Sequence, residues 1–270
     1  MSTQVKPLLA ASASTAQSTA GTSSRNLLGH AAFILAFIGL WEFSSRQEWL
    51  NPTFFGRPSG IAQYLWNGLV VDRKLWLELG YTVAGTLLSF VLGSVLAIAV
   101  GLLFAMFPKF EKAAEPYLTV LNAMPRLALA PLFLLWFGLG IGSKVAVGTS
   151  LSFFIVLANT IAGIRGVSAD HITLSRSLGA TPSQLFFKVT LPSAVPVIAS
   201  GLRLGLIYSM LGVIGSEIIA AEHGLGQVLS YLQSTFNMNG VMGVTLLLAF
   251  MGLLVTAGMS RLERSLLKWQ

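Results

Sequence analysis

The chain has 270 residues, of which 54% are hydrophobic and only 10% are charged. Soluble domains carry roughly 25% charged residues, and a globule of this length needs them to cover its surface. The composition therefore excludes an ordinary soluble fold and indicates a membrane protein. The net charge of +7 arises from basic residues scattered singly between apolar runs. Since these residues form no patch, we expect no nucleic-acid partner.

Metal and enzyme chemistry find no support in the sequence. The chain has no cysteine, which excludes disulfides and thiolate metal sites. Its three histidines, His30, His171 and His223, fall in separate segments without an acidic or histidine partner at ligand spacing. An intramembrane enzyme needs a nucleophile and a base, or metal ligands, at matching depth, and the apolar segments carry few such residues. We therefore expect no enzymatic activity, no bound metal and no cofactor.

The beginning of the chain is expected to be disordered. Residues 8–24 are small, polar and uncharged, with no apolar period that could repay the entropy of ordering them. We therefore interpret residues 1–26 as a disordered cytoplasmic tail and residues 27–270 as one transmembrane domain.

Six apolar stretches follow, each close to or above the roughly 20 residues that a helix needs to cross a bilayer. In chain order they are residues 27–43, 81–107, 117–137, 145–164, 194–221 and 241–259. Between the first two, Pro52, Pro58 and a partly amphipathic run over 61–79 predict a segment along the membrane surface. The sequence thus predicts an all-α, polytopic membrane protein with about six transmembrane helices.

Lysine and arginine counts predict which side each loop faces, because short basic loops resist translocation. With the N-terminus in the cytoplasm, ten basic residues lie inside and five, Lys144 among them, lie outside. Arg126 and Arg203 remain near helix ends. We therefore expect both termini in the cytoplasm.

The second apolar stretch carries a small residue at every fourth position. These residues are Gly85, Ser89, Gly93, Ala97, Gly101 and Ala105. Small residues let helix backbones approach closely in lipid, where packing replaces the hydrophobic effect. We favour close helix packing along this ridge over the alternative, a ligand channel.

Three residues in the apolar stretches are candidates for an aqueous pathway: Pro125, Arg126 and Glu217. Proline frees backbone carbonyls, which must face protein or water in a membrane, and charged side chains usually face an aqueous path or a partner. For Arg126 the alternative is contact with lipid headgroups near a helix end. For Glu217 the alternative is a structural hydrogen bond to a neighbouring helix.

No nucleotide site is visible in the sequence. Residues 138–144, GLGIGSK, superficially resemble a phosphate loop. The lysine follows serine and precedes valine, so the required spacing fails. We interpret this run as a short glycine-rich turn between the third and fourth stretches.

The most informative segment is the loop over residues 165–192, which does not span the membrane. Asp170 is expected to cap a short helix, and Gly179 suits the left-handed conformation that commonly ends one. The run TPSQ at 181–184 has the pattern of a capping box with proline at the first helical position. Pro192 is expected to end that second helix.

Two short helices joined at a glycine would expose apolar side chains in the cytoplasm. These are Ile172, Leu174, Leu178, Leu185, Phe186 and Phe187. Exposed apolar groups commonly mark a partner, and an amphipathic helix laid into a hydrophobic groove is a recurring mode of recognition. The alternative is that the pair packs under its own bundle or lies on lipid headgroups.

Residues along this loop resemble the EAA loop of ABC importer permeases. The matching positions are the run SRSLGAT at 175–181, Gln184, Val189, Leu191, Pro192, Pro196 and residues 201–203. Other features are similar to the branch that imports aliphatic sulfonates, taurine, nitrate and related solutes. They are Glu217, the Gly-Leu-Gly at 224–226, the run at 124–132 and the basic C-terminal helix.

The resemblance implies a permease with the fold of type I ABC importers in the inner membrane of a bacterium. Its implied partners are a second permease copy, two cytosolic ATPase subunits that bind ATP, and an external solute-binding protein. A small anion such as a sulfonate or taurine would be moved inward, with no bond in the solute broken. The residues implied to form the ATPase-coupling loop are Asp170, Thr173, Leu174, Ser175, Leu178, Gly179, Ala180, Gln184, Phe187, Leu191 and Pro192.

The loop departs from the family pattern at one place. Thr173, Leu174 and Ser175 occupy the positions of the Glu-Ala-Ala motif, so the acidic contact with the ATPase is missing there. Asp170, about one helical turn earlier, is the candidate replacement.

The alternative function is an ion-coupled secondary transporter of a small solute. Such a transporter would need an intramembrane ionisable pair or an inverted repeat with broken helices. Neither is clear in the sequence. The spans also show no anion site, and the resemblance to ABC importers implies that the external binding protein selects the solute.

Overall fold

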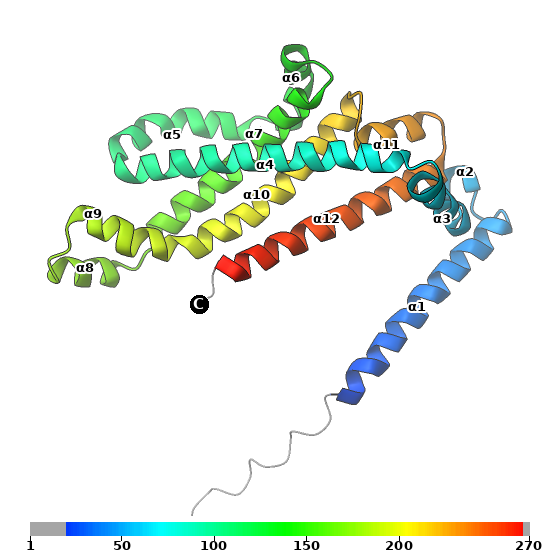
Figure 1. The fold of residues 1–270 in the computed structure, drawn as a ribbon, viewed down its shortest axis with the longest axis horizontal. Helices are drawn as coiled ribbons and strands as arrows, with labels where there is room; N and C mark the ends of the chain where they lie inside the picture. Colours follow the sequence, from blue (N-terminus) through cyan, green and yellow to red (C-terminus); the bar gives the residue numbers. More distant parts are fainter. Residues whose placement is uncertain (1–19, 267–270) are drawn as a thin grey trace, which may run out of the picture. The chain divides into compact units, whose positions relative to one another are not determined.

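The structure, a computed structural model, describes residues 20–266 (Figure 1). Every regular element within these residues is a helix, so the predicted all-α class is confirmed. The chain divides into two compact units, one that ends at Gly60 and one that begins at Ile61. The larger second unit holds the candidate sites.

The first unit contains α1 (Ala20–Arg46) and α2 (Pro52–Phe55). The turn between them is fixed by the hydroxyl of Ser45, which donates to the carbonyl of Gly56 over 3.0 Å. Large apolar side chains on α1 are exposed. The expected tail of residues 1–26 lies largely outside the described part, and the chain is helical from the first described residue onward.

The second unit is a bundle of long helices joined by shorter ones (Figure 1). Its elements are the end of α3 (Pro58–Trp66), the π-helical η1 (Asn67–Val71), α4 (Lys74–Met106), α5 (Pro108–Ala123), the 3₁₀ turn η2 (Arg126–Leu129), α6 (Ala130–Phe137), α7 (Ile141–Arg165), α8 (Ala169–Ser177), α9 (Pro182–Leu185), the π-helical η3 (Phe186–Thr190), α10 (Leu191–Ile219), α11 (Leu225–Ser234) and α12 (Met238–Leu266). α4, α7 and α10 pack against one another, and α11 contacts α4, α10 and α12.

Four helices of the described residues are long and apolar enough to cross a membrane, against six expected. They are α4, α7, the continuous helix Pro182–Ile219, and α12. α5 counts as a fifth span only if it is joined to η2 and α6 across a bend of 84°. The expected first span lies in α1 and stays a prediction.

The bend interrupts the third span, which the sequence predicts as one continuous helix over 117–137. It lies at Pro125, because the proline ring disfavours a helical conformation of the residue before it. Met124 is accordingly extended, with φ −69° and ψ 135°. α5 therefore ends early, and Arg126 starts a separate turn from which it reaches α7.

The central contact of the bundle is a close approach of α4 to α7. The predicted ridge on α4 is buried from Gly85 to Gly101. A Cβ added at Gly93 would lie 2.1 Å from the Ser152 hydroxyl and 3.1 Å from the Thr149 carbonyl. Only a glycine lets the two backbones come this close. The interpretation of the ridge as a helix-packing surface is confirmed.

An apolar cluster holds α11 at one end of the bundle. Leu225 and Leu232 of α11 are buried against Leu75 of α4 and Val244 of α12. Full burial of a side chain of this size contributes about 1.5–3 kcal/mol. We call this the α11 end, and the opposite end, where α8 and α9 follow α7, the loop end.

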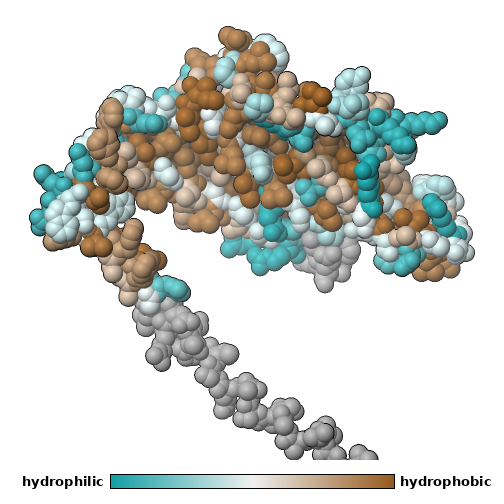
Figure 2. Space-filling view, turned by 180° about the vertical axis from the view of Figure 1, so that it is seen from behind, coloured by the Kyte–Doolittle hydropathy of each residue, from teal (hydrophilic) through white to brown (hydrophobic). Residues whose placement is uncertain are grey.

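Apolar side chains dominate the face of the molecule seen in Figure 2. Leu135, Trp136 and Leu253 are among the large apolar side chains that are strongly exposed. In water such a surface would drive aggregation, whereas the hydrocarbon of a bilayer solvates it. The surface thus agrees with a multi-pass membrane protein.

Replacing Gly93 by alanine should destabilise the bundle by about 1–3 kcal/mol, because the new methyl group would overlap α7. Gly80, on the same helix, is the matched control. Nothing lies within 4 Å of a Cβ there, so alanine should be neutral or slightly stabilising. The measurement is the midpoint of thermal unfolding of both purified variants in detergent. Equal midpoints would contradict the close contact of α4 with α7.

Candidate functional site

The loop over residues 165–192 contains two short helices, as predicted, but with a different cap at the first. α8 begins after Ser168, whose hydroxyl accepts a hydrogen bond from the Asp170 N–H over 3.3 Å. Ser168 takes the cap because it is the last residue with an extended backbone. Asp170 lies in the first turn instead, where its carboxylate interacts favourably with the positive end of the helix dipole.

The junction between α8 and α9 has the geometry that the sequence predicts. Gly179 has φ +81°, the left-handed conformation that glycine adopts without strain. The Thr181 hydroxyl accepts from the Gln184 N–H, and the Gln184 side-chain carbonyl accepts from the Thr181 N–H. The capping box is therefore complete, and α9 has a sharply defined start.

The second helix does not end at Pro192, contrary to the prediction. α9, η3 and α10 form one continuous helix, Pro182–Ile219, of 38 residues. In η3 the N–H of Leu191 bonds to the carbonyl of Phe186, five residues back. Because this wide turn already departs from the regular bonding pattern, a proline without an N–H is accepted directly after it. At 1.5 Å per residue the helix is about 57 Å long.

The loop presents an apolar surface on its outside. Leu174, Leu178 and Phe187 are exposed by 60%, 79% and 58%. Among the other residues of the predicted coupling loop, Asp170, Thr173, Gly179 and Gln184 are exposed, and Ser175, Ala180, Leu191 and Pro192 are half-buried. The structure thus brings the predicted residues together on one segment at the loop end.

The altered motif at 173–175 offers a partner no charge. The Ser175 hydroxyl donates to the carbonyl of His171 within its own helix. The exposed Asp170 is therefore the acidic group on α8 that a basic partner could reach.

The side of α9 that faces α4 and α7 is incompletely packed. An open cavity of about 490 Å³ lies between α9 and the ends of α4 and α7, and Met106, Ile164 and Phe187 are among the lining residues. Tight packing would resist a shift of α9, whereas this space permits one.

The three candidate pathway residues do not share one site. Pro125 is exposed, whereas Arg126 is turned onto its own bundle. The Arg126 guanidinium donates to the Ser150 carbonyl and to the Asn122 side chain over 2.7 Å, and lies 3.9 Å from the centre of the Phe154 ring. These contacts bury Arg126 against α7.

Glu217 forms a fully buried ion pair with Lys144, which sequence analysis missed. The Lys144 Nζ lies 2.9 Å from Glu217 Oε1, and the two side chains are exposed by 2% and 0%. The prediction of a turn over 138–144 is wrong for residues 141–144, which are helical. α7 begins at Ile141, and Lys144 is buried in the first turn of this helix. The sequence signal for this pair is a lone lysine and a lone glutamate, each among mostly apolar residues.

Further polar groups satisfy the buried carboxylate of Glu217. The Thr82 hydroxyl, on α4, lies 2.9 Å from Glu217 Oε2. The N–H of Gly226 donates to the same oxygen over 3.0 Å. A buried ion pair needs such additional hydrogen bonds, because its own attraction does not repay the loss of hydration. Four helices, α4, α7, α10 and α11, therefore meet at Glu217.

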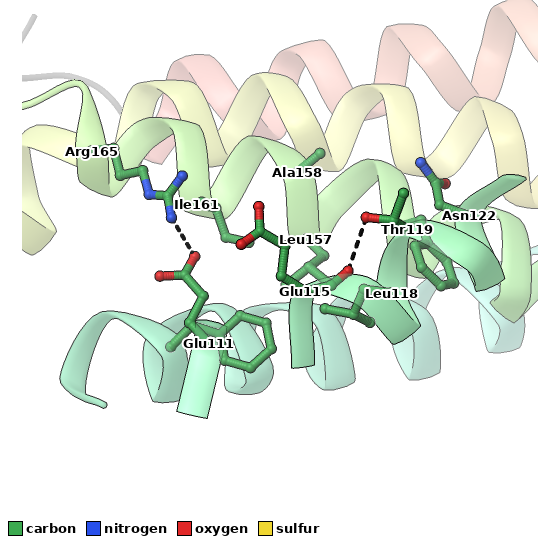
Figure 3. A pocket seen from close by; sticks show the side chains of 11 residues that line it. Glu111, Glu115, Leu118, Thr119, Asn122, Leu157, Ala158, Ile161 and Arg165 are labelled. Carbon is green, nitrogen blue, oxygen red and sulfur yellow. Dashed lines mark hydrogen bonds and ion pairs between the residues drawn. The ribbon is translucent and has the colours of Figure 1, made fainter. Parts of the chain in front are cut away.

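A pocket of about 240 Å³ opens between α4, α5 and α7 (Figure 3). Its lining residues are Phe104, Glu111, Glu115, Leu118, Thr119, Asn122, Phe154, Leu157, Ala158, Ile161 and Arg165. The Arg165 guanidinium lies 2.7 Å from the Glu111 carboxylate, so these two charges compensate each other. Figure 3 shows Glu115 between that pair and Thr119, and no charged group among the lining residues pairs with it. One uncompensated carboxylate disfavours a bare anion in this pocket.

Comparison with known proteins assigns the family. Residues 93–268 match the family of binding-protein-dependent transport system inner membrane components. The chain is 32% identical over 242 residues to the formylaminopyrimidine transport permease protein ThiX of Halalkalibacterium halodurans, covering 88% of this chain and 94% of that protein. It is 31% identical over 233 residues to the putative aliphatic sulfonates transport permease protein SsuC of Bacillus subtilis, covering 86% and 84%.

The fold agrees with this assignment. The chain is similar to a subunit of the MetNI methionine ABC transporter in an inward-facing conformation, with a TM-score of 0.63 and 20% identity. The match covers 73% of this chain and 99% of that one. The chain therefore belongs to the family of ABC transporter permeases, the non-catalytic inner-membrane components of binding-protein-dependent systems, which bind no cofactor and leave ATP to a separate ATPase.

Proposed function

We propose that this permease subunit carries a small organic solute, a sulfonate such as taurine, into a bacterial cell, and that α8 and α9 receive the force of the ATPase. The observation that carries this proposal is the continuous helix Pro182–Ile219. Its first turn is the exposed α9, and the remainder crosses the bundle. Family membership contradicts the alternative of an ion-coupled secondary transporter.

The mechanism follows from the stiffness of that helix. Closure of an ATPase dimer would move α8 and α9 through their exposed apolar side chains, Leu178 and Phe187 foremost. Because no break separates α9 from α10, this displacement would be passed along the helix into the membrane. The cavity behind α9 leaves room for the shift. Rocking of α4, α7 and α10 as one body against the second permease copy would then switch the path from inward-open to outward-open.

Basic residues support an orientation with the loop end and both termini in the cytoplasm. Lys144 is buried in α7 and is therefore no longer counted among the basic residues of the external loops. Ten basic residues then lie inside and four outside. The solute-binding protein would then dock at the α11 end.

A second copy of the chain is the proposed neighbour of α5. No residue of α5 is buried within this chain, and Tyr117, Val120 and Leu121 are exposed by half or more. A helix that carries both exposed apolar and charged side chains fits a subunit interface beside an aqueous path better than a lipid-facing position. We therefore propose a homodimer whose axis lies near α5.

The proposed solute rests on the relatives. SsuC of Bacillus subtilis and the 26% identical TauC of Escherichia coli are described as permeases for aliphatic sulfonates and for taurine. A formylaminopyrimidine, after ThiX, is the second candidate. The pocket of Figure 3 favours it, because Phe104, Phe154 and the free carboxylate of Glu115 suit an aromatic ring with N–H donors.

A cysteine introduced at Ser183 should crosslink to the ATPase subunit, because this exposed residue lies in α9. The chain has no cysteine of its own, so the background is empty. Tyr231→Cys, exposed on α11 at the opposite end, is the matched control and should give no ATPase crosslink. If the intact complex shows no crosslink from position 183, the coupling assignment fails.

Gly179→Val should weaken ATPase binding about tenfold, because a left-handed conformation costs a β-branched residue about 1–2 kcal/mol and the junction would rearrange. Gly179→Asn is the control and should lose less, since asparagine tolerates this conformation. The measurement is the dissociation constant of the ATPase from the permease in lipid nanodiscs. Equal constants for both variants would contradict a role for this junction.

The solute is tested on the partner solute-binding protein. Titration calorimetry with taurine, ethanesulfonate, nitrate and a formylaminopyrimidine should give the tightest binding for a sulfonate. The preference should reach about tenfold, a difference of about 1.4 kcal/mol. Tighter binding of the pyrimidine would replace the sulfonate by the second candidate.

A further inference from the structure

Residues 222–226, which connect α10 to α11 and begin α11, each make a contact of their own with another helix or its flanking turn. The N–H of Glu222 donates to the carbonyl of Leu139, just before α7, over 3.4 Å. The carbonyl of His223 accepts from the Lys144 Nζ over 2.7 Å. The His223 ring stacks on Tyr81 of α4, with 4.5 Å between the ring centres. Two successive residues are thus tied to α4 and to the start of α7.

The next three residues are held through their N–H groups. Gly224 donates to the Glu78 carboxylate, Leu225 to the Thr82 hydroxyl and Gly226 to the Glu217 carboxylate. These N–H groups begin α11, where a helix has no internal acceptors for them. α4 and α10 supply those acceptors, so the start of α11 is fixed to both helices.

Two glycines wrap this segment around Glu217. A Cβ at Gly224, where φ is +120°, would lie 2.1 Å from Glu217 Cδ. A Cβ at Gly226 would lie 2.6 Å from Glu217 Cβ. No side chain fits at either position, so the backbone lies directly on the glutamate. The glycine-leucine-glycine run at 224–226 therefore has a structural reason.

Glu217 lies at the far end of the helix whose first turn is α9. Pro182 and Glu217 belong to the same continuous helix, so a displacement at the loop end reaches the glutamate. Its partner Lys144 stands at the start of α7. Separating Lys144 from Glu217 would leave two unpaired charges away from water. The two side chains therefore stay paired during a displacement, and the start of α11, to which both are bonded through residues 223 and 226, moves with them.

We propose that Lys144 and Glu217 are a positioning pair that makes α11 follow α10, and that this pair links the ATPase end of the permease to its external face. The inference rests on the proposed function for the identity of the two ends. It assigns to the buried charges a role in coupling, beyond holding the bundle together.

The main test replaces both charges, K144M together with E217M. Apolar residues of similar size often replace a buried ion pair without loss of stability. The complete complex in vesicles is assayed for solute molecules moved per ATP hydrolysed. This ratio should fall about tenfold, within the range typical of coupling between sites, while ATP hydrolysis continues. An unchanged ratio overturns the proposal.

The matched control is R203M together with E263M. These residues form another ion pair of α10, with α12, that does not touch the segment at 222–226. Its replacement should leave the ratio at the wild-type value. An equal fall in the control would mean that any lost ion pair uncouples transport, and would overturn the specific role of Lys144 and Glu217.

A second variant, G226A, covers the case in which the double variant does not assemble. It keeps both charges and only pushes the start of α11 off Glu217. Spin labels on a cysteine at the exposed Glu222, one in each copy of the proposed homodimer, report the distance between the two copies at this segment. In the otherwise wild-type chain this distance should change with the nucleotide state. In G226A it should broaden and no longer respond, and a wild-type response would overturn the proposal.

Failure of the linkage and failure of the proposed function give different results. A wild-type complex that moves no solute with ATP refutes the importer function itself. A wild-type complex that transports, together with variants that keep the full ratio, refutes only the positioning pair.

Discussion

Close contact between helix backbones is the constraint on which the rest of this protein depends. Apolar surface gains little by leaving lipid tails, so α4, α7 and α10 are held by packing and by polar contacts between them. A Cβ at Gly148 would lie 2.5 Å from the Ser89 hydroxyl, and one at Gly212 would lie 2.8 Å from the Gly148 Cα. Three helices thus meet around one glycine. Their small separation brings the side chains of Lys144 and Glu217 within bonding distance.

The two ends of the bundle are built in opposite ways. At the loop end, α8 and α9 leave apolar side chains exposed and have a cavity behind them, so their surroundings are incomplete without a partner. At the α11 end, the charges of Lys144 and Glu217 are buried and bonded to four helices. The proposed mechanism, in which force enters at the loop end while the α11 end keeps its shape, requires this difference. The helix Pro182–Ile219 joins the two.

Local features of the sequence predicted local features of the structure well. The ridge on α4, the left-handed Gly179 and the capping box at Thr181 each depend on residues within a few positions, and all three were found. The bend at Pro125 was missed because apolar residues continue on both sides of it. The pairing of Lys144 with Glu217 joins residues 73 positions apart, and each lone charge signals only that it needs a partner, not which residue that partner is. The candidate site was therefore predictable at the loop end and hidden at the α11 end.

The π-helical turn η3 has a consequence for how the loop end can vary. A π turn carries one residue more than a regular turn, and each residue of an α-helix advances the side chains by about 100°. The direction in which α9 presents its side chains is therefore set by η3 independently of the direction in which α10 meets α7. A relative that lacks the extra residue would keep the same membrane packing while turning its cytosolic contacts to another side. Under the proposed coupling through α9, permeases would in this way change ATPase partners without rebuilding the bundle.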